Sequence, residues 1–192
     1  MPNIIVIAGP NGAGKSTAAP ALLRDLLGID DFVNADDIAR GLSAFNPEGA
    51  AMEAGRLMLA RLRELAAANR DFAFETTLAS RTFAPWIAKL KEEQGYTFTL
   101  FYLWVPDFGF SIDRVTRRVR LGGHHVPSGD IQRRYARGIH NFFDLYRPLA
   151  DRWEVYDNRD ARRLMAAKGT RTGEHVYDRH IWHHMLEVHE HG

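Results

Sequence analysis

Residues 9–16 read Gly-Pro-Asn-Gly-Ala-Gly-Lys-Ser and directly follow the apolar run Ile4–Ala8. This is the complete G-x-x-x-x-G-K-[ST] pattern of a phosphate-binding loop (P-loop), in the strand–loop–helix order that gives the pattern its meaning. Its glycines let backbone N–H groups turn inward around phosphate oxygens, and the next helix directs its positive end at the same anion. A glycine-rich turn with no nucleotide is the alternative, which the preceding strand disfavours. The sequence therefore predicts binding of a nucleoside triphosphate.

The residues expected to hold the nucleotide are those of the loop and of the helix start: Gly9, Pro10, Asn11, Gly12, Ala13, Gly14, Lys15, Ser16 and Thr17. The Lys15 ammonium can reach the β- and γ-phosphates as a point charge, and the Ser16 hydroxyl can hold Mg²⁺. ATP and Mg²⁺ are therefore the expected cofactors.

The composition bounds the class of protein. A chain of 192 residues, 45% hydrophobic and 26% charged, is typical of one soluble globular domain with a real core. No apolar run is long enough for a transmembrane helix, and the chain start leaves no room for a signal peptide. The absence of cysteine excludes disulfides and thiolate metal sites and fits a cytoplasmic protein. A net charge of +1 gives no global argument for binding nucleic acid or membranes.

Apolar segments alternate with helical patterns along the chain, which predicts an α/β sandwich of the P-loop type with a mostly parallel five-stranded sheet and a helical lid. Strands are expected at Asn3–Ala8, Phe32–Val33, Phe72–Phe74, Tyr96–Val105 and Trp153–Tyr156, and helices at Lys15–Leu27 and at about 48–68, 82–93, 108–121 and 128–145. Residues 1–192 are expected to form one domain, in which 161–192 are a C-terminal helical extension. His180 and His184 in this extension have the spacing of a helical metal pair, but no further ligand is evident, so a solvated helix face is the preferred interpretation.

In open α/β sheets, ligands bind beyond the carboxyl ends of the strands. The polar residues that end the expected strands should therefore meet the P-loop in one crevice; they are Asn34, Asp36, Asp37, Glu75, Thr76, Thr77, Asp157 and Asn158. Phosphoryl transfer needs a carboxylate that takes the proton of the acceptor, and Asp36 is the best candidate for this base. Alternatively, Asp36 or Asp37 caps the helix that begins near Ile38, and the later aspartate is the preferred cap. Glu75 either binds substrate, or holds the water shell of Mg²⁺, or only bonds a neighbouring loop.

Arginine outnumbers lysine by 21 to 4, and seven arginines lie between residues 114 and 137. Two groups have spacings that put their members on one helical face, before and after Gly122-Gly123: Arg114, Arg117 and Arg118, then Arg133, Arg134 and Arg137. The guanidinium fork suits phosphate oxygens, so the two helices predict a lid that closes over the triphosphate. The alternative is that several of these arginines are solvated surface residues, above all Arg117 and Arg137.

With these segments the chain resembles the zeta-toxin-like P-loop kinases from about Ile4 to Asn158. The resemblance is carried by the P-loop, by Asn34-Ala35-Asp36, by Phe74-Glu75-Thr76-Thr77 and by the arginine segment around Gly122-Gly123-His124. It implies that Asp36 is the general base and that Glu75, with Thr76, contacts substrate. It also implies that lid arginines hold the γ-phosphate together with Lys15; the best matches are Arg118 and Arg134, with Arg120 and Arg133 as substitutes.

Characterised zeta toxins phosphorylate a UDP-N-acetylamino sugar and are restrained by a partner antitoxin. The resemblance thus implies an ATP-dependent kinase that transfers the γ-phosphoryl group to a hydroxyl of a small molecule, with a UDP-amino sugar and an antitoxin as expected partners. The short segment Gly122–Pro127 is similar to the compact subgroup, whose substrates are mostly unassigned. A kinase for a sugar acid or a nucleoside would share the fold. An alternative of another class is an ATPase or nucleotide switch that acts on a protein partner, and nucleic acid is not an expected partner because no basic stripe extends beyond the lid.

Overall fold

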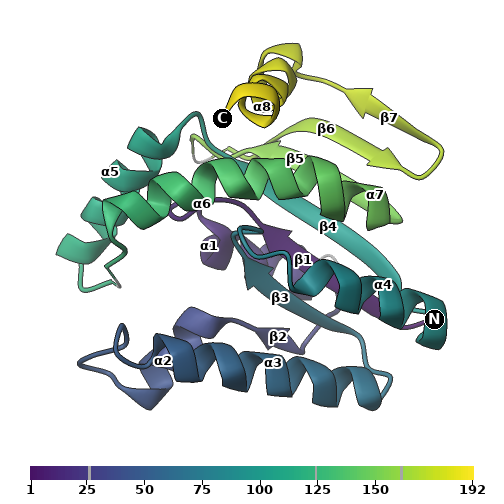
Figure 1. The fold of residues 1–192 in the computed structure, drawn as a ribbon, viewed down its shortest axis with the longest axis horizontal. Coiled ribbons are helices and arrows are strands. Elements are labelled where there is room, and N and C mark those ends of the chain that lie inside the picture. The colour runs from purple at the N-terminus through teal and green to yellow at the C-terminus, as the bar shows by residue number, and fades with distance from the viewer. Residues whose placement is uncertain (26, 124, 161) are drawn as a thin grey trace.

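The computed structural model describes residues 1–25, 27–123, 125–160 and 162–192. Its centre is a sheet with the strand order β2-β3-β1-β4-β5-β6-β7 (Figure 1). The strands are β1 (Asn3–Ala8), β2 (Phe32–Val33), β3 (Phe72–Thr76), β4 (Thr97–Trp104), β5 (Arg152–Asp157), β6 (Leu164–Thr170) and β7 (Gly173–Val176). The first five are parallel to their neighbours, and β6 and β7 are antiparallel. The predicted α/β fold with a mostly parallel sheet is confirmed.

The sheet has seven strands, not the expected five, because 161–192 is not purely helical. Its described part forms the β6–β7 hairpin and then α8 (Arg179–His191). The β6 sequence, Leu-Met-Ala-Ala-Lys-Gly-Thr, is poor in the β-branched and aromatic residues that favour strands. Its conformation comes from pairing with β5, where the Trp153 ring lies so close that a Cβ on Gly169 would be 2.4 Å from it.

The helices follow the expected segments closely. They are α1 (Lys15–Pro20), α2 (Ala35–Leu42), α3 (Ala51–Ala67), α4 (Phe83–Gln94), α5 (Phe108–Arg120), α6 (Ser128–Asn141) and α7 (Arg147–Leu149), with π-helical turns η1 (Ala21–Asp25) and η2 (Phe142–Tyr146). The helix expected at Lys15–Leu27 changes from α to π geometry directly after Pro20. Proline has no N–H to donate, so the α-helical hydrogen-bond ladder is interrupted there.

The hydrophobic core lies on both sides of the central strands. Residues of β1 and β4 are buried in unbroken runs, as is typical of parallel strands covered on both faces. At the far end of the sheet, α8 packs against α6 and β6 (Figure 1). There the Trp182 ring stacks on Trp153 at 5.4 Å and meets Phe143 edge-on at 5.3 Å.

The histidines of α8 do not form a metal site with other described residues. Among the described residues, no group of three or more His, Cys, Asp or Glu side chains could hold a metal ion. His184 packs against the Trp104 ring, with the ring centres 5.7 Å apart, whereas His180 is exposed. The solvated-face interpretation therefore fits His180 and not His184. None of the described helices is both long enough and apolar enough to cross a membrane.

Candidate active site

The P-loop joins the buried end of β1 to the first turn of α1. Gly9, Gly12 and Gly14 have φ angles of 140°, 75° and 82°, a region that side chains rarely adopt. A Cβ on Gly9 would also lie 2.4 Å from the carbonyl oxygen of Leu103 in the neighbouring strand β4. Gly14 caps α1 without a side chain, so no side-chain acceptor competes for the N–H groups at the helix start. These N–H groups remain available for an anion.

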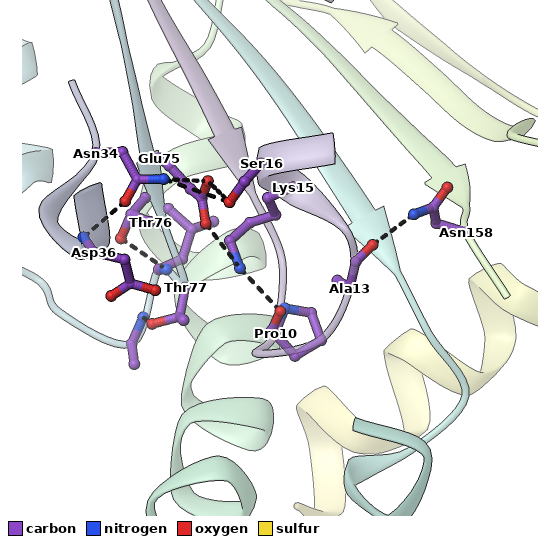
Figure 2. Close-up of polar contacts among 12 residues, drawn as sticks. Pro10, Ala13, Lys15, Ser16, Asn34, Asp36, Glu75, Thr76, Thr77 and Asn158 are labelled. Carbon is purple, nitrogen blue, oxygen red and sulfur yellow. Dashed lines mark hydrogen bonds and ion pairs between the residues drawn. The ribbon is translucent and has the colours of Figure 1, made fainter. Parts of the chain in front are cut away.

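The Lys15 side chain is buried under the loop, with 6% of its surface exposed. Its Nζ donates to the Pro10 carbonyl oxygen at 2.9 Å and lies 3.6 Å from Oε1 of Glu75 (Figure 2). Burial lowers the pKa of Lys15, while the charges of Glu75 and Asp36 act to raise it and that of Arg118 acts to lower it. The ammonium thus lies within electrostatic range of two carboxylates and one guanidinium.

Glu75, near the end of β3, lies beside Lys15 and Ser16 of the P-loop. Its Oε2 accepts hydrogen bonds from the Ser16 hydroxyl at 2.8 Å and from the Asn34 carboxamide at 2.9 Å (Figure 2). The parallel pairing of β1 with β3 sets this position, because Ile7 is opposite Glu75 immediately before the P-loop begins. These bonds join Glu75 to two neighbouring segments, and its predicted roles at the substrate or at the metal stay predictions.

The oxygen atoms of Ser16 and Glu75 fit Mg²⁺. They are hard donors only 2.8 Å apart, beside the end of the P-loop. Mg²⁺ is usually held by one or two protein oxygens together with phosphates and water, and not by a cage of protein ligands.

Asp36 lies in the first turn of α2, and Asn34 is the residue that caps this helix. The Asn34 carboxamide oxygen accepts the Asp36 backbone N–H at 2.8 Å. The interpretation of Asp37 as the cap is therefore wrong, because the helix begins at Ala35 and not near Ile38. Asp37 instead pairs with Arg40 on the surface. The Asp36 side chain is not used as a cap, and Figure 2 shows it on the Lys15 and Glu75 side of α2.

The two threonines that follow Glu75 shape the turn after β3. The Thr76 hydroxyl accepts the Leu78 N–H at 3.1 Å, and the Thr77 hydroxyl accepts the Ala79 N–H at 3.4 Å. Leu78 has a φ of 57° and is completely buried. Thr76 therefore has a structural bond beside its predicted contact with substrate.

The turn after β3 is attached to α6. A Cβ on Gly138 would lie 2.5 Å from the Thr77 carbonyl oxygen, so the helix backbone approaches this turn directly. The Asn141 carboxamide donates to the Leu78 carbonyl oxygen at 2.7 Å, and the Tyr146 hydroxyl donates to that of Ser80 at 2.6 Å. The C-terminal end of α6 and the following η2 turn are thus attached to the turn after β3.

The lid arginines divide into two groups. Arg118 is half-buried, and its charge acts on Lys15. Arg133 bonds Asp130 at 2.7 Å, and the Arg134 guanidinium lies 3.8 Å from the other oxygen of the same carboxylate. Arg120 is exposed. Arg117 and Arg137, which the sequence predicts to be solvated, are exposed as well. The charge of Arg118 thus acts within the P-loop, Arg134 is half-buried beside Asp130, and four other predicted lid arginines are exposed: Arg117, Arg120, Arg133 and Arg137. His124 of the expected lid lies outside the described residues.

Arg114 and Asn158 form a rear wall of the P-loop; Asn158 meets the loop as the sequence predicts, whereas the sequence did not indicate this place for Arg114. The Arg114 guanidinium donates to the carbonyl oxygens of Gly12 at 3.3 Å, Asn158 at 2.9 Å and Arg159 at 2.7 Å. The Asn158 carboxamide donates to the Ala13 carbonyl oxygen at 2.5 Å (Figure 2). Burial lowers the pKa of Arg114. In the sequence, the only mark of Arg114 is the helical face that it shares with Arg118. That spacing fits a lid arginine equally well, so it did not indicate the contacts with the P-loop.

Changing Gly14 to alanine is expected to lower ATP affinity by about tenfold or more. The new Cβ would lie 2.7 Å from the Asn158 carboxamide nitrogen, which would push the rear wall away from the loop. Gly28→Ala is the matched control, because Gly28 also has a positive φ but no atom lies within 4 Å of its Cβ position. Calorimetric titration with MgATP measures the effect. Equal losses of affinity in both variants would contradict the assignment of this contact.

Comparisons with known proteins support this description of the fold. The sequence profile of the AAA domain family (AAA_33) matches residues 4–137. An uncharacterized protein of Haemophilus influenzae is 28% identical over 131 residues, which cover 68% of this chain and 91% of that protein.

Two solved structures have the same fold. A chain of the AvrRxo1-ORF1:AvrRxo1-ORF2 complex with sulphate ions superposes with a TM-score of 0.78 at 15% identity, over 98% of this chain. This chain spans only 64% of the length of that one, and the complex is also known with ATP. A chain of the PezAT chromosomal toxin–antitoxin system of Streptococcus pneumoniae superposes with a TM-score of 0.67 at 14% identity, over 100% of this chain and 80% of that one. The P-loop kinase-like fold is therefore confirmed.

Proposed function

The chain belongs to the AAA domain family and has the fold of the zeta-toxin-like P-loop kinases, and from this premise we propose that it is an ATP-dependent phosphotransferase. It transfers the γ-phosphoryl group to a hydroxyl of a small molecule, and a UDP-N-acetylamino sugar is the first acceptor to test. One observation carries the proposal: the buried Lys15 of a complete P-loop lies within electrostatic range of both Asp36 and Arg118. Because such a kinase needs ATP, the cytoplasm is its proposed location.

The proposed reaction uses few side chains. Lys15 and the loop N–H groups hold the β- and γ-phosphates, while Ser16 and Glu75 hold the metal ion. Mg²⁺, when bound, supplies charge neutralisation across these phosphates. The Asp36 carboxylate takes the proton of the acceptor hydroxyl while the hydroxyl oxygen forms a bond to the γ-phosphorus. The bond from that phosphorus to the bridging oxygen of ADP breaks, and Arg118 and Arg134 neutralise the charge that develops.

A cavity beside α2 supports a small-molecule acceptor. It has a volume of about 410 Å³ and lies between the loop after α2 and the segment after α5. Its lining includes Arg40, one helical turn from Asp36, together with Phe45, Glu48 and His125. His125 Nδ1 lies 3.5 Å from Oε1 of Glu48, so the two segments already touch across this space. Ligand sites commonly have volumes of about 300–1,000 Å³.

The test is ATP turnover with and without a panel of hydroxyl acceptors, read by phosphorus NMR. The panel holds UDP-amino sugars, sugar acids and nucleosides, and the Lys15→Ala variant is the control for contaminating kinases. A new phosphomonoester signal with one acceptor, absent from the control, is the expected result. No new signal with any acceptor would contradict the kinase proposal.

A protein partner is a second proposal, and its support comes from the two solved structures. Both come from systems of two proteins, one of them a toxin–antitoxin system. If the chain is instead an ATPase or nucleotide switch, the same panel will give ATP hydrolysis that no acceptor stimulates. Growth of cells that express the wild-type chain or Lys15→Ala tests whether the activity is toxic and therefore needs an antitoxin.

A further inference from the structure

Asn34 has contacts with both sides of the candidate active site. Its side chain is buried, with 5% exposed. The carboxamide oxygen accepts the backbone N–H of Asp36 at 2.8 Å, and the nitrogen donates to Oε2 of Glu75 at 2.9 Å. The same nitrogen lies 3.4 Å from the Ser16 hydroxyl oxygen (Figure 2). One side chain thus joins the segment that carries the proposed base to the two residues that fit the metal.

The two ends of this carboxamide cannot exchange roles. A backbone N–H needs an acceptor, which only the carboxamide oxygen provides, and a carboxylate needs a donor, which only the nitrogen provides. Asparagine and aspartate are equally good helix caps, so capping of α2 alone does not require asparagine at position 34. The contact with Glu75 does require it, because an aspartate would set a second negative charge against that carboxylate.

The joined segments come from three different elements. Ser16 belongs to α1, Glu75 to the end of β3, and Asn34 follows β2 and precedes α2. β2 pairs with β3 only through the two residues that precede Asn34, Phe32 and Val33. Beyond that short ladder, the Asn34 carboxamide is a direct link between the start of α2 and the end of β3.

We propose that Asn34 is a positioning residue that holds Glu75 beside Ser16 and at the same time fixes the Asp36 backbone. One side chain thereby positions both the residues on the metal side of the phosphoryl group and the residue on its acceptor side. The inference rests on the proposed function for the roles of MgATP and Asp36. Its consequence for nucleotide binding does not depend on the identity of the acceptor.

The first test compares ATP affinity with Mg²⁺ and with EDTA, measured by calorimetry on the full chain. Asn34→Ser keeps a helix cap but is too short to reach Glu75. We expect its affinity for MgATP to fall by about tenfold, the factor that corresponds to one hydrogen bond to a charged group. Its affinity for ATP in EDTA should stay within about threefold of wild type. Equal losses under both conditions would overturn the inference, since a merely structural role would weaken both.

A double-mutant cycle tests whether Asn34 acts through Glu75. Glu75→Gln removes the negative charge of the carboxylate to which the Asn34 nitrogen donates its hydrogen bond. In that background, Asn34→Ser should cause no further loss of Mg²⁺-dependent affinity beyond about twofold. Losses that multiply across the two sites would overturn the inference.

Asn34→Asp is the second variant, because it keeps the size and the cap. It should keep the cap of α2, while the second buried negative charge beside Glu75 lowers the melting temperature and reduces ATP turnover at pH 8 by about 100-fold. Wild-type turnover in this variant would overturn the inference. Asp178→Ser is the control, since Asp178 caps α8 through the N–H groups of His180 and Ile181 and lies in another helix. That change should leave MgATP affinity as it is.

These results separate the inference from the proposed function. If wild type binds MgATP but phosphorylates no acceptor, the kinase proposal fails, and the comparison of Mg²⁺ with EDTA still decides the role of Asn34. If an acceptor is phosphorylated while Asn34→Ser binds MgATP like wild type, the inference fails and the kinase proposal stands.

Discussion

Replacing Arg118 with alanine is expected to lower turnover by about 10³- to 10⁵-fold, the range that a supplied arginine contributes to phosphoryl transfer. Arg118 is half-buried, and its charge already acts on Lys15 inside the P-loop. The charge on the γ-phosphoryl oxygens grows as the reaction proceeds, so a guanidinium there stabilises the transition state more than bound ATP. Affinity for MgATP should therefore change by less than about tenfold. Single-turnover kinetics together with calorimetry measure the two quantities separately.

Arg117→Ala is the matched control for this experiment. Arg117 is the neighbour of Arg118 on α5 but is exposed, and exposed charges contribute little. Its turnover should stay within about twofold of wild type. Arg134→Ala should cause a smaller loss than Arg118→Ala, because the Arg134 guanidinium lies 3.8 Å from the Asp130 carboxylate, which partly neutralises its charge. Equal losses in turnover and in ATP affinity for Arg118→Ala would contradict its assignment to the transferring group.

Asp36→Asn is expected to lower turnover by about 10²- to 10⁴-fold, the usual contribution of a general base. The substitution keeps the size of the side chain, and the cap of α2 is untouched because Asn34 supplies it. ATP affinity near pH 7 should stay within about threefold of wild type, since the base acts on the acceptor and not on the nucleotide. The rate of phosphomonoester formation at saturating acceptor is the measurement.

A second effect of Asp36→Asn concerns pH. The Asp36 charge raises the pKa of Lys15, which burial lowers, so its removal leaves that pKa lower still. Phosphates bind the charged ammonium, so ATP affinity falls as the pH rises through the pKa of Lys15. Titrations between pH 7 and pH 9 should therefore show a steeper loss of affinity in the variant. Asp37→Asn is the control, because Asp37 pairs with Arg40 on the surface; a large loss of turnover in this control would count against Asp36 as the base.

The central strands and the place of the site could be predicted because both follow from local signals. The apolar run Asn3–Ala8 and the P-loop fix the start of the sheet, and the carboxyl-end rule brings Asp36 and Glu75 toward it. The β6 strand could not be predicted, because its conformation depends on pairing with β5 and not on its own residues. A sequence shows such long-range pairing only when propensity and pattern agree with it.

The details of the site depend on geometry that the residues alone do not specify. Asn34 is the cap because its backbone is extended, with φ −129° and ψ 122°, while Asp37 is already inside the helix. Glu75 meets Ser16 because of the register between β1 and β3, which no motif encodes. Arg114 and Arg118 are one turn apart on α5, yet Arg114 bonds backbone carbonyls whereas the charge of Arg118 lowers the pKa of Lys15.

The attachment of α6 to the turn after β3 has a consequence for variation and engineering of this protein. The main-chain carbonyl groups of that turn are in contact with Gly138, Asn141 and Tyr146. An insertion in the turn would therefore disturb the helix and the strand together. The loop after α2 and the connection between α5 and α6 border the same cavity. Changes of length are tolerated best in exposed loops that a rigid scaffold presents. A library that aims at a new acceptor should therefore diversify the mostly exposed residues 43–50 and leave 76–80 and the buried Val126 unchanged.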